Sequence, residues 1–188
     1  MLTTPFLQVG LVEMHSMVTT TGGNLVLDDS FTRGAFQGSL RRLFAVDPDD
    51  NNDLIMAFNA ETQVICSKEI KVQGASGHLT SLNRKSTSVA ETTVGVGGTC
   101  AWRLGGIDHT ATAAFFFDLT NTATAPPAAG APQGPQQCYV QIATKYRHSS
   151  GRLHLRVTTV AKPLQQLDTP AGHAAIRVAF DQVRRCIA

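Results

Sequence analysis

The sequence predicts a mainly β fold: an antiparallel β-sandwich flanked by an N-terminal α/β segment and a C-terminal helix. Three observations predict it. Between Leu54 and Val160, short stretches alternate apolar and polar residues with the two-residue period of a strand. Glycine-rich turns separate these stretches, and no helical periodicity interrupts them. The longest stretch, Gln137–Val160, is typical of two strands joined by a polar turn.

Residues 1–46 predict a fragment of an α/β layer. The mixed apolar segment Val9–Val18 is compatible with a helix, and Asn24–Leu27 predicts a short buried strand. A second helix is expected over Phe31–Phe44, with apolar residues at helical spacing and two arginines in its last turn. A single strand cannot form a sheet, so we expect this segment to lack the body on which it would pack.

A break rich in acidic and turn-forming residues follows at Asp47–Asp53. It lacks the glycine and terminal glutamate of an EF-hand loop, so a solvated linker explains it better than a calcium site. Trp102 is expected in the core beside Phe115 and Phe117. The strands expected after the break and before the hairpin are Leu54–Phe58, Thr62–Ser67, Glu69–Gln73, Thr99–Leu104 and Thr112–Leu119.

Two segments outside the expected strands complete the predicted domain organisation. Thr120–Gln136 is rich in alanine, proline and glycine and predicts a flexible excursion. Ala174–Ile187 places apolar residues at helical spacing and predicts the first helix of a further domain. We therefore expect three parts: residues 1–46 from the end of one domain, residues 47–163 forming the sandwich, and residues 164–188 starting a helical domain.

The hairpin expected at Gln137–Val160 turns at His148-Ser149-Ser150-Gly151. On its first arm, apolar residues alternate with residues that include Lys145 and Arg147. On its second arm, leucine and valine alternate with arginine and histidine. Antiparallel pairing is expected to give a ribbon with one apolar side and one strongly basic side. The candidate functional residues are the basic side chains Lys145, Arg147, Arg152, His154 and Arg156.

The charge pattern favours an anionic membrane or protein surface as the partner of this basic side. Net charge is only +2, but no acidic residue occurs between Asp118 and Asp168. Near an anionic leaflet, each lysine or arginine contributes on the order of 1 kcal/mol. A basic face that meets only water is the competing interpretation. Nucleic acid is not expected, because aromatic residues make up only 6% and are not interleaved with basic ones.

The four cysteines Cys66, Cys100, Cys138 and Cys186 are far apart, without the C-x-x-C pairs of a zinc site. Each is expected to pack as a small apolar residue, and no cofactor is expected. The N-terminus lacks the pattern of a signal peptide, and no stretch reaches the roughly 20 apolar residues of a membrane span. These features predict a soluble intracellular protein.

Three short motifs invite a catalytic interpretation. Gly95–Gly98 resembles a phosphate loop, but a strand rather than a helix follows it, so a tight turn or bulge is expected. In His148-Ser149-Ser150 a histidine base stands beside two hydroxyls, and in Asp108-His109 a histidine stands beside an acid. No nucleophile elbow is visible and hairpin tips are exposed, so polar turn residues explain these motifs better than a catalytic triad.

Several blocks of the sequence resemble one family, in the order in which that family has them. The blocks are QVGLVEM (Gln8–Met14), TGGNLVLDDSF (Thr21–Phe31), CSKEIKVQGASG (Cys66–Gly77), VGVGGTCAWRLGGI (Val94–Ile107), TKYRHSSGRLHLRVTTVAK (Thr144–Lys162) and AFDQ (Ala179–Gln182). Together they resemble the GTPase-activating Sec subunit of the COPII vesicle inner coat. The HSSG turn followed by RVTT favours this subunit over its cargo-selecting paralogue.

This resemblance implies the end of a von Willebrand-A-like trunk, most of a β-sandwich and the start of an all-helical domain, in agreement with the three parts above. It also implies a role in ER-to-Golgi vesicle formation. The implied location is cytoplasmic, peripheral on the cytosolic face of the ER membrane and in the vesicle coat. The implied partners are a Sar-type small GTPase, the cargo-binding paralogue, the outer coat and the anionic ER membrane surface.

The resemblance further implies which parts of the family lie outside this sequence. In the family, a zinc finger and most of the trunk precede this region, and the gelsolin-like domain with the activating arginine follows it. We therefore expect a fragment that is not an enzyme and holds no zinc, and no arginine here is assigned the activating role. The family sandwich also takes strands from the N-terminal end of the full protein. An unpaired sheet edge or an exposed apolar face is therefore expected.

Two alternatives stay open on sequence grounds. A free-standing β-sandwich that binds anionic membrane or protein surfaces through the basic hairpin would have a closed sheet. A small hydrolase would need a histidine within hydrogen-bonding distance of a serine inside a pocket.

Overall fold

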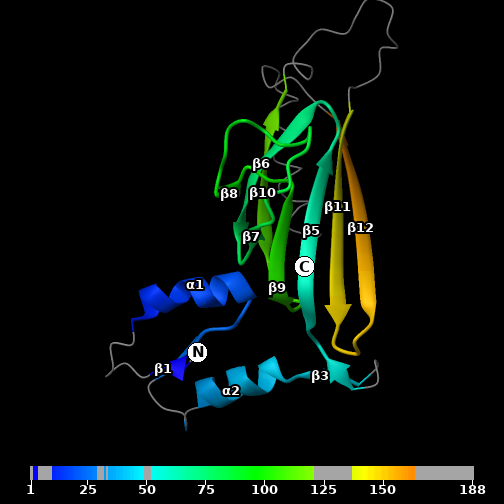
Figure 1. The fold of residues 1–188 in the computed structure, drawn as a ribbon. Helices are drawn as coiled ribbons and strands as arrows, with labels where there is room; N and C mark the ends of the chain where they lie inside the picture. Colours follow the sequence, from blue (N-terminus) through cyan, green and yellow to red (C-terminus); the bar gives the residue numbers. More distant parts are fainter. Residues whose placement is uncertain are drawn as a thin grey trace, which may run out of the picture.

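The structure, a computed structural model, describes residues 2–3, 10–28, 32, 34–48, 52–120 and 137–163. In these residues the protein is mainly β, with two helices lying beside one end of a two-layered sandwich (Figure 1). The excursion expected at Thr120–Gln136 falls outside them apart from its first residue. The helix expected at Ala174–Ile187 and the cysteine Cys186 also lie outside the described residues.

The larger sheet of the sandwich is antiparallel, with the strand order β12-β11-β5-β9-β7. Its strands are β5 (Ala57–Cys66), β7 (Thr80–Ser81), β9 (Ala101–Ile107), β11 (Gln137–His148) and β12 (Leu153–Pro163). The smaller sheet has the order β10-β6-β8. Its strands are β6 (Ile70–Gly77), β8 (Val96–Gly97) and β10 (Ala113–Leu119). The antiparallel sandwich that the alternation predicts is confirmed.

The core lies between the two sheets and centres on Trp102. This side chain is completely buried, its ring centroid lies 5.3 Å from that of Phe115, and its Nε1 donates a hydrogen bond to the Val96 carbonyl at 2.8 Å. Phe117 departs from the expected core position and is 38% exposed, because the pairing of β10 with β6 shifts register between Phe116 and Phe117. The other fully or almost fully buried apolar residues around Trp102 are Val64, Val72, Ala75, Leu79 and Cys100.

The glycine-rich loop before β9 is a tight turn and not the start of a helix. Gly95 and Gly98 adopt φ angles of +62° and +70°, which L-residues with a side chain adopt rarely. Between them, β8 pairs with β6. The turn or bulge expected at Gly95–Gly98 is therefore confirmed, and the Trp102 hydrogen bond to Val96 holds this loop against the core.

The N-terminal part contains α1 (Leu11–Thr21), β2 (Val26–Leu27) and α2 (Gly34–Leu43). β2 pairs in parallel with β1 (Leu2–Thr3), so the single strand expected here has a partner that the sequence pattern did not reveal. Neither helix buries a side chain, and apolar residues such as Val12 and Phe44 are exposed. These exposed apolar side chains agree with the expectation that the segment lacks the body on which it would pack.

Neither described helix is long and apolar enough to cross a membrane.

The C-terminal end of α1 rests on β9 through backbone atoms. Gly22 and Gly105 approach so closely that a Cβ atom on Gly105 would lie 2.2 Å from the Thr21 carbonyl oxygen. Gly105 also has a φ angle of +72°. Two glycines therefore fix the position of α1 against the sandwich.

The acidic break expected as a linker is partly structured. β3 (Val46–Asp47) pairs antiparallel with β4 (Asp53–Leu54) to form a small hairpin before β5. β5 is one long strand where two were expected. It contains Asn59 at a φ angle of +52°, and the pairing with β9 shifts register at this point. A bulge in one strand explains the interrupted alternation that suggested two.

Candidate functional site

The β11–β12 hairpin turns through three residues, Ser149–Gly151, rather than the four expected. His148 donates its backbone N–H to the Arg152 carbonyl at 2.8 Å and closes the loop. Gly151 has a φ angle of +85°, as the last residue of a three-residue hairpin loop commonly does. Arg147 consequently pairs with Leu153. Each earlier residue of β11 pairs with the residue equally far beyond Leu153 in β12, as Lys145 does with Leu155.

This register distributes the basic residues over two faces of the hairpin. Lys145 lies opposite Leu155 and Arg147 opposite Leu153, on the solvent face of the large sheet. On the face that carries Val140 and Ile142 of the core, Arg156 lies opposite Thr144, and His154 lies opposite Tyr146. The predicted ribbon with one apolar and one basic side is therefore wrong. The observed loop is one residue shorter than the expected turn, and this difference moves every side chain of β12 to the other face relative to β11.

The five candidate residues nevertheless gather at one end of the hairpin. Lys145, Arg147, Arg152, His154 and Arg156 lie within five residues of the turn along their strands. Among them, His154 is held by ring contacts: its centroid lies 5.4 Å from that of Tyr146, in a stacked arrangement, and 5.5 Å from that of His148. The structure therefore places a basic end, rather than a basic face, at the tip of β11 and β12. We call these five residues the basic tip.

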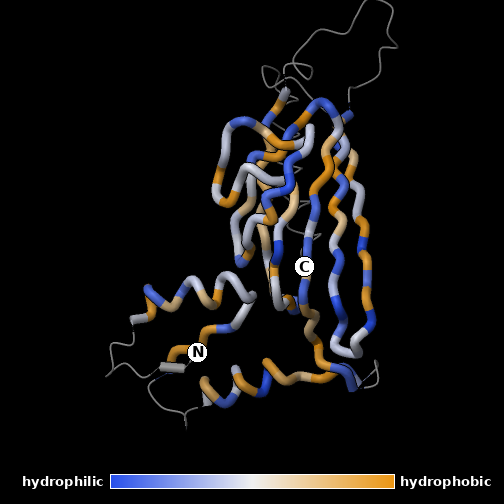
Figure 2. Tube along the Cα trace, in the orientation of Figure 1, coloured by the Kyte–Doolittle hydropathy of each residue, from blue (hydrophilic) through white to orange (hydrophobic). Residues whose placement is uncertain are grey.

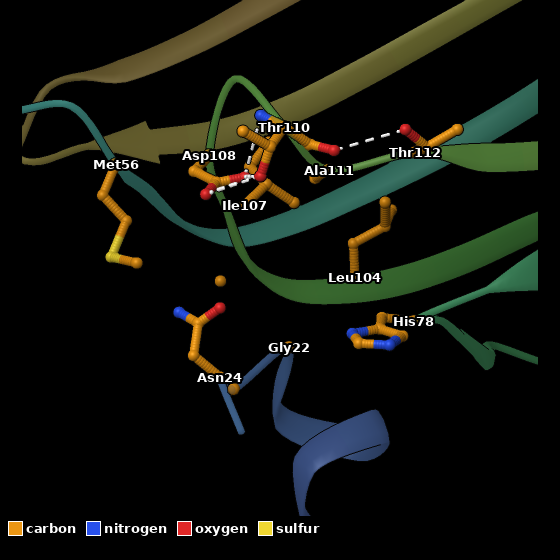
Figure 3. A pocket seen from close by; sticks show the side chains of 12 residues that line it. Gly22, Asn24, Met56, His78, Leu104, Ile107, Asp108, Thr110, Ala111 and Thr112 are labelled. Atoms are coloured by element: carbon orange, nitrogen blue, oxygen red, sulfur yellow. Dashed lines mark hydrogen bonds between the residues drawn. The ribbon is translucent and has the colours of Figure 1, made fainter. Parts of the chain in front are cut away.

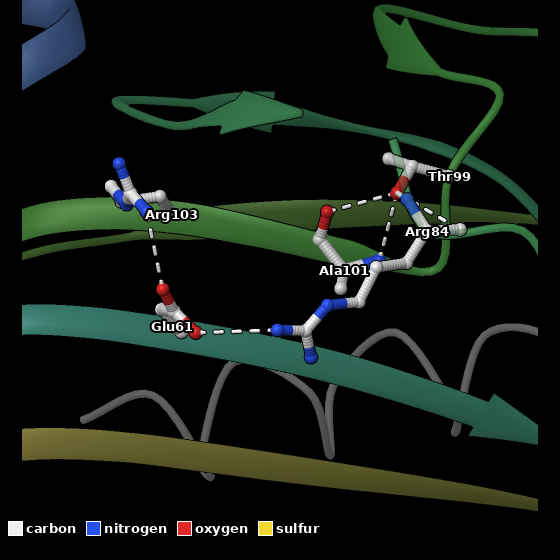
Figure 4. Close-up of polar contacts among 5 residues, drawn as sticks. All are labelled: Glu61, Arg84, Thr99, Ala101 and Arg103. Atoms are coloured by element: carbon white, nitrogen blue, oxygen red, sulfur yellow. Dashed lines mark hydrogen bonds and ion pairs between the residues drawn. The ribbon is translucent and has the colours of Figure 1, made fainter. Parts of the chain in front are cut away.

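The acidic side chain directly across from Lys145 is already engaged by arginines. Glu61 on β5, the cross-strand neighbour of Lys145, lies 3.4 Å from Arg103 and 3.7 Å from Arg84 (Figure 4). Thr99 positions the second arginine, because its Oγ1 accepts a hydrogen bond from the Arg84 N–H and donates one to the Arg84 carbonyl. Two arginines around one carboxylate leave this part of the face cationic. No sequence motif indicated this cluster, because its members come from three distant segments.

The turn itself is anchored to the linker hairpin. Ser149 Oγ donates a hydrogen bond to the Leu54 carbonyl at 2.9 Å, and Asp53 Oδ2 lies 4.0 Å from Nδ1 of His148. Nδ1 of His148 also lies 3.0 Å from Ser150 Oγ. In a Ser-His-Asp triad the serine and the acid engage opposite ring nitrogens, whereas here both groups approach the same nitrogen. Ser150 is also exposed, so this cluster has the geometry of a turn and not of a hydrolase site.

A cavity of about 260 Å³ lies where the end of α1 meets the β9–β10 loop (Figure 3). Met56 closes one side, and the polar side chains that line the cavity are Asn24, His78, Asp108, Thr110 and Thr112. Burial opposes ionisation of Asp108, but hydrogen bonds from Thr110 hold the pKa of its carboxyl below the ordinary value. No serine lines the cavity among the described residues, so these residues do not provide the histidine and serine that the hydrolase hypothesis needs.

The described cysteines pack in and beside the core as expected. Burial, followed by the neighbouring thiols of Cys138 and Cys100, raises the pKa of the Cys66 thiol to about 11. Burial raises the pKa of Cys138 as well, and the nearby Glu69 carboxylate adds to this effect. Within the described ranges, no group of three or more metal-binding side chains is close enough to hold an ion.

The Cys66 thiol should therefore alkylate slowly. Because its pKa of about 11 lies above the ordinary value of 9.0, the thiol stays neutral at pH 8, and only the thiolate is a good nucleophile. We expect iodoacetamide to label Cys66 much more slowly in the folded protein than in urea at the same pH. Peptide mass spectrometry would measure this. Equal rates in the two states would contradict the raised pKa.

The comparisons with known proteins agree with this architecture. The sequence model of the Sec23/Sec24 beta-sandwich domain matches residues 57–165, more than half of the chain. Among solved structures, the chain is similar to the human COPII-coat protein Sec24c, with a TM-score of 0.52 and 18% sequence identity. That match covers 84% of this chain and 17% of the Sec24c chain. The structural similarity shows the fold, and the chain spans less than a fifth of the protein it resembles.

Proposed function

The chain belongs to the Sec23/Sec24 β-sandwich family, and from this premise we propose that it is part of the GTPase-activating subunit of the COPII inner coat. The HSSG turn followed by RVTT, within Thr144–Lys162, supports this subunit over the cargo-selecting paralogue. The proposed division of the chain keeps a trunk end at residues 1–46, a sandwich at 47–163 and the start of a helical domain at 164–188.

The proposed role is not hydrolytic. In GTPase activation the small GTPase carries out phosphoryl transfer, and an inserted arginine stabilises charge in its transition state. We assign this role to no arginine of the present chain. The chain would act as a scaffold that contributes contacts to the Sar-type GTPase complex, the paralogue and the outer coat on the cytosolic face of the ER membrane.

The proposed membrane contact rests on one observation: the two strands that form the basic tip contain no acidic residue. β11 and β12 contain no aspartate or glutamate, and Glu61 is shared between two arginines. Cationic side chains that surround the end of a sandwich can approach anionic headgroups whichever face they occupy. Leu153 and Leu155, which are 63% and 68% exposed, stand beside Arg147 and Lys145 and add apolar area at this end. We therefore propose that the sandwich meets the membrane with the basic tip.

Charge reversal tests the membrane contact. We expect the combined change Lys145→Glu, Arg147→Glu, Arg152→Glu and Arg156→Glu to weaken binding to phosphatidylserine-containing liposomes by roughly tenfold or more, since each cation contributes on the order of 1 kcal/mol. Binding of the unaltered chain should weaken as salt increases. Liposome co-sedimentation at several salt concentrations measures both effects.

The matched control reverses two arginines elsewhere. Arg41 and Arg42 lie in the last turn of α2, outside the sandwich, so their change to glutamate should leave most of the liposome binding intact. If the tip variant bound as well as the unaltered chain, the basic tip would be a surface that meets only water. If both variants lost binding equally, net charge rather than the tip would be responsible.

The subunit assignment has its own test. We expect the chain, tagged in cells, to label COPII subunits at ER exit sites in a proximity-biotinylation experiment. Because no arginine of this chain is assigned the activating role, the isolated chain should neither hydrolyse GTP nor accelerate its hydrolysis by the Sar-type GTPase. The identity of the coat subunit that copurifies with the chain distinguishes the two types. Copurification of the cargo-binding paralogue would support the proposed assignment, whereas copurification of the GTPase-activating subunit would favour the cargo-selecting type. Absence of coat subunits would instead favour a free-standing membrane-binding sandwich, although β12 pairs only with β11 among the described residues and such an open edge does not suit that alternative.

A further inference from the structure

The turn between β11 and β12 carries two serines, and the structure gives them different surroundings. Ser149 is half-buried, and its Oγ donates a hydrogen bond to the Leu54 carbonyl at 2.9 Å. Ser150 is exposed, and its Oγ lies 3.0 Å from Nδ1 of His148. The hydroxyl of Ser149 therefore ties the turn to the linker hairpin. In the described part of the chain, the hydroxyl of Ser150 contacts only its own turn, so it is the one available for modification.

Basic residues stand on both sides of Ser150. Arg147 lies three residues before it and Arg152 two residues after it. No other serine or threonine of the sequence has a lysine or arginine at both of these positions. Thr87, which is also exposed, has Arg84 three residues before it but a valine two residues after it. Figure 2 shows strongly hydrophilic residues on both strands next to the turn. Kinases choose substrates by such charge patterns, and this pattern fits a serine kinase that selects basic residues.

A kinase needs the loop as an extended segment, and this end of the hairpin can open without exposing core residues. Backbone hydrogen bonds hold the loop closed, from the His148 N–H to the Arg152 carbonyl and from the Gly151 N–H to the His148 carbonyl. Residues 150–153 are all exposed, so opening the loop breaks these bonds but uncovers little apolar area. Segments with few buried contacts open locally at the lowest free energy.

A phosphate on Ser150 would change the charge of the basic tip. The tip contains four lysine and arginine side chains, Lys145, Arg147, Arg152 and Arg156. Since β11 and β12 contain no aspartate or glutamate, a phosphate in their turn would introduce a negative charge that these strands lack. A phosphoserine carries a charge of about −1.5 to −2 near pH 7, which would cancel about half of the positive charge of these four side chains.

We propose that Ser150 is a phosphorylation site for a serine kinase that selects basic residues, and that its modification weakens the membrane contact proposed above, on which this regulation rests. In the transfer, Ser150 Oγ attacks the γ-phosphorus of ATP, and an Oγ–P bond forms. The bond from the γ-phosphorus to the oxygen that bridges it to the β-phosphate breaks, and ADP leaves. The hydroxyl proton passes to a carboxylate base of the kinase. Ser150 itself is not one of the five residues assigned to the membrane contact.

Phosphate incorporation into the full chain tests the acceptor. The chain is incubated with the catalytic domain of protein kinase C, Mg²⁺ and ATP, and peptide mass spectrometry locates the phosphate. We expect most of it on Ser150, and Ser150→Ala should lower total incorporation at least fivefold. The matched control Ser149→Ala removes the neighbouring hydroxyl and should retain most of the incorporation. Phosphate found mainly on Ser149 or Thr87, or no incorporation at all, would overturn the proposal.

Liposome co-sedimentation tests the regulation. We expect the phosphorylated chain to bind phosphatidylserine-containing liposomes roughly tenfold more weakly than the unmodified chain, because the phosphate offsets the attraction of the cations to the headgroups. Removal of the phosphate by a phosphatase should restore binding. The Ser150→Ala variant, treated with kinase and ATP, should bind as the unmodified chain does. Undiminished binding of the phosphorylated chain would refute the regulation.

The two measurements also separate this regulation from the proposed function. If the unmodified chain does not bind the liposomes, the proposed membrane contact is wrong and its regulation is overturned with it, even where Ser150 is phosphorylated. If the unmodified chain binds and phosphorylation of Ser150 changes nothing, the membrane contact stands and only the regulation is overturned.

Discussion

Replacement of Trp102 by alanine should lower the free energy of unfolding by about 3–5 kcal/mol, the usual cost of removing a large buried aromatic side chain. Trp102 is completely buried between the two sheets and contacts Phe115. Its removal leaves a cavity in the centre of the core and also takes the hydrogen-bond donor from the Val96 carbonyl. Urea denaturation followed by circular dichroism would measure the loss, with the unaltered chain as reference.

The change Trp102→Phe separates the two contributions. Phenylalanine keeps an aromatic ring in the core but cannot donate a hydrogen bond to Val96. We expect it to cost less than the alanine variant, while the glycine-rich loop at Gly95–Gly98 becomes more accessible to proteolysis. An alanine variant as stable as the unaltered chain would show that Trp102 does not organise the core.

The second large effect is expected at Gly105, where alanine should destabilise the contact between α1 and β9. Its φ angle of +72° costs about 1–2 kcal/mol for a residue with a Cβ atom. The new Cβ would also lie 2.2 Å from the Thr21 carbonyl oxygen, a distance at which the backbone must move. We expect the end of α1 to separate from the sandwich, which limited proteolysis and thermal denaturation would detect.

Gly98 supplies a matched control for this prediction. Its φ angle of +70° is almost the same, but a Cβ atom there would meet nothing within 4 Å. Gly98→Ala should therefore show only the backbone cost of about 1–2 kcal/mol and leave α1 in place. Equal losses in both variants would mean that the close approach of Gly22 and Gly105 contributes nothing to the docking of α1.

The alternation of apolar and polar residues was enough to predict most of the sandwich. The strands that contain Trp102 and Phe115 are found where they were expected, as is the turn at Gly95–Gly98. Local patterns predict these features because each strand must bury one face, and because a positive φ angle favours glycine. The interrupted pattern around Asn59 misled the prediction of β5, since a bulge breaks the alternation without ending the strand.

Contacts between distant segments could not be predicted in the same way. The parallel pairing of β1 with β2 depends on a strand of two residues, too short for any periodicity. The cluster of Glu61, Arg84 and Arg103 joins three segments that only the closed sheet brings together. The cavity between α1 and the β9–β10 loop likewise forms where segments far apart in the sequence meet, beside the close approach of Gly22 and Gly105.

By itself the sequence determined the fold class, the position of the hairpin and the concentration of basic residues near its turn. Only the tertiary structure decided which of these residues share a face. The reason is that the register of a hairpin depends on the length of its loop. The observed loop, Ser149–Gly151, is one residue shorter than the expected turn His148–Gly151, and this difference moves every side chain of β12 to the other face relative to β11. The same reversal placed the exposed Leu153 and Leu155 beside Arg147 and Lys145.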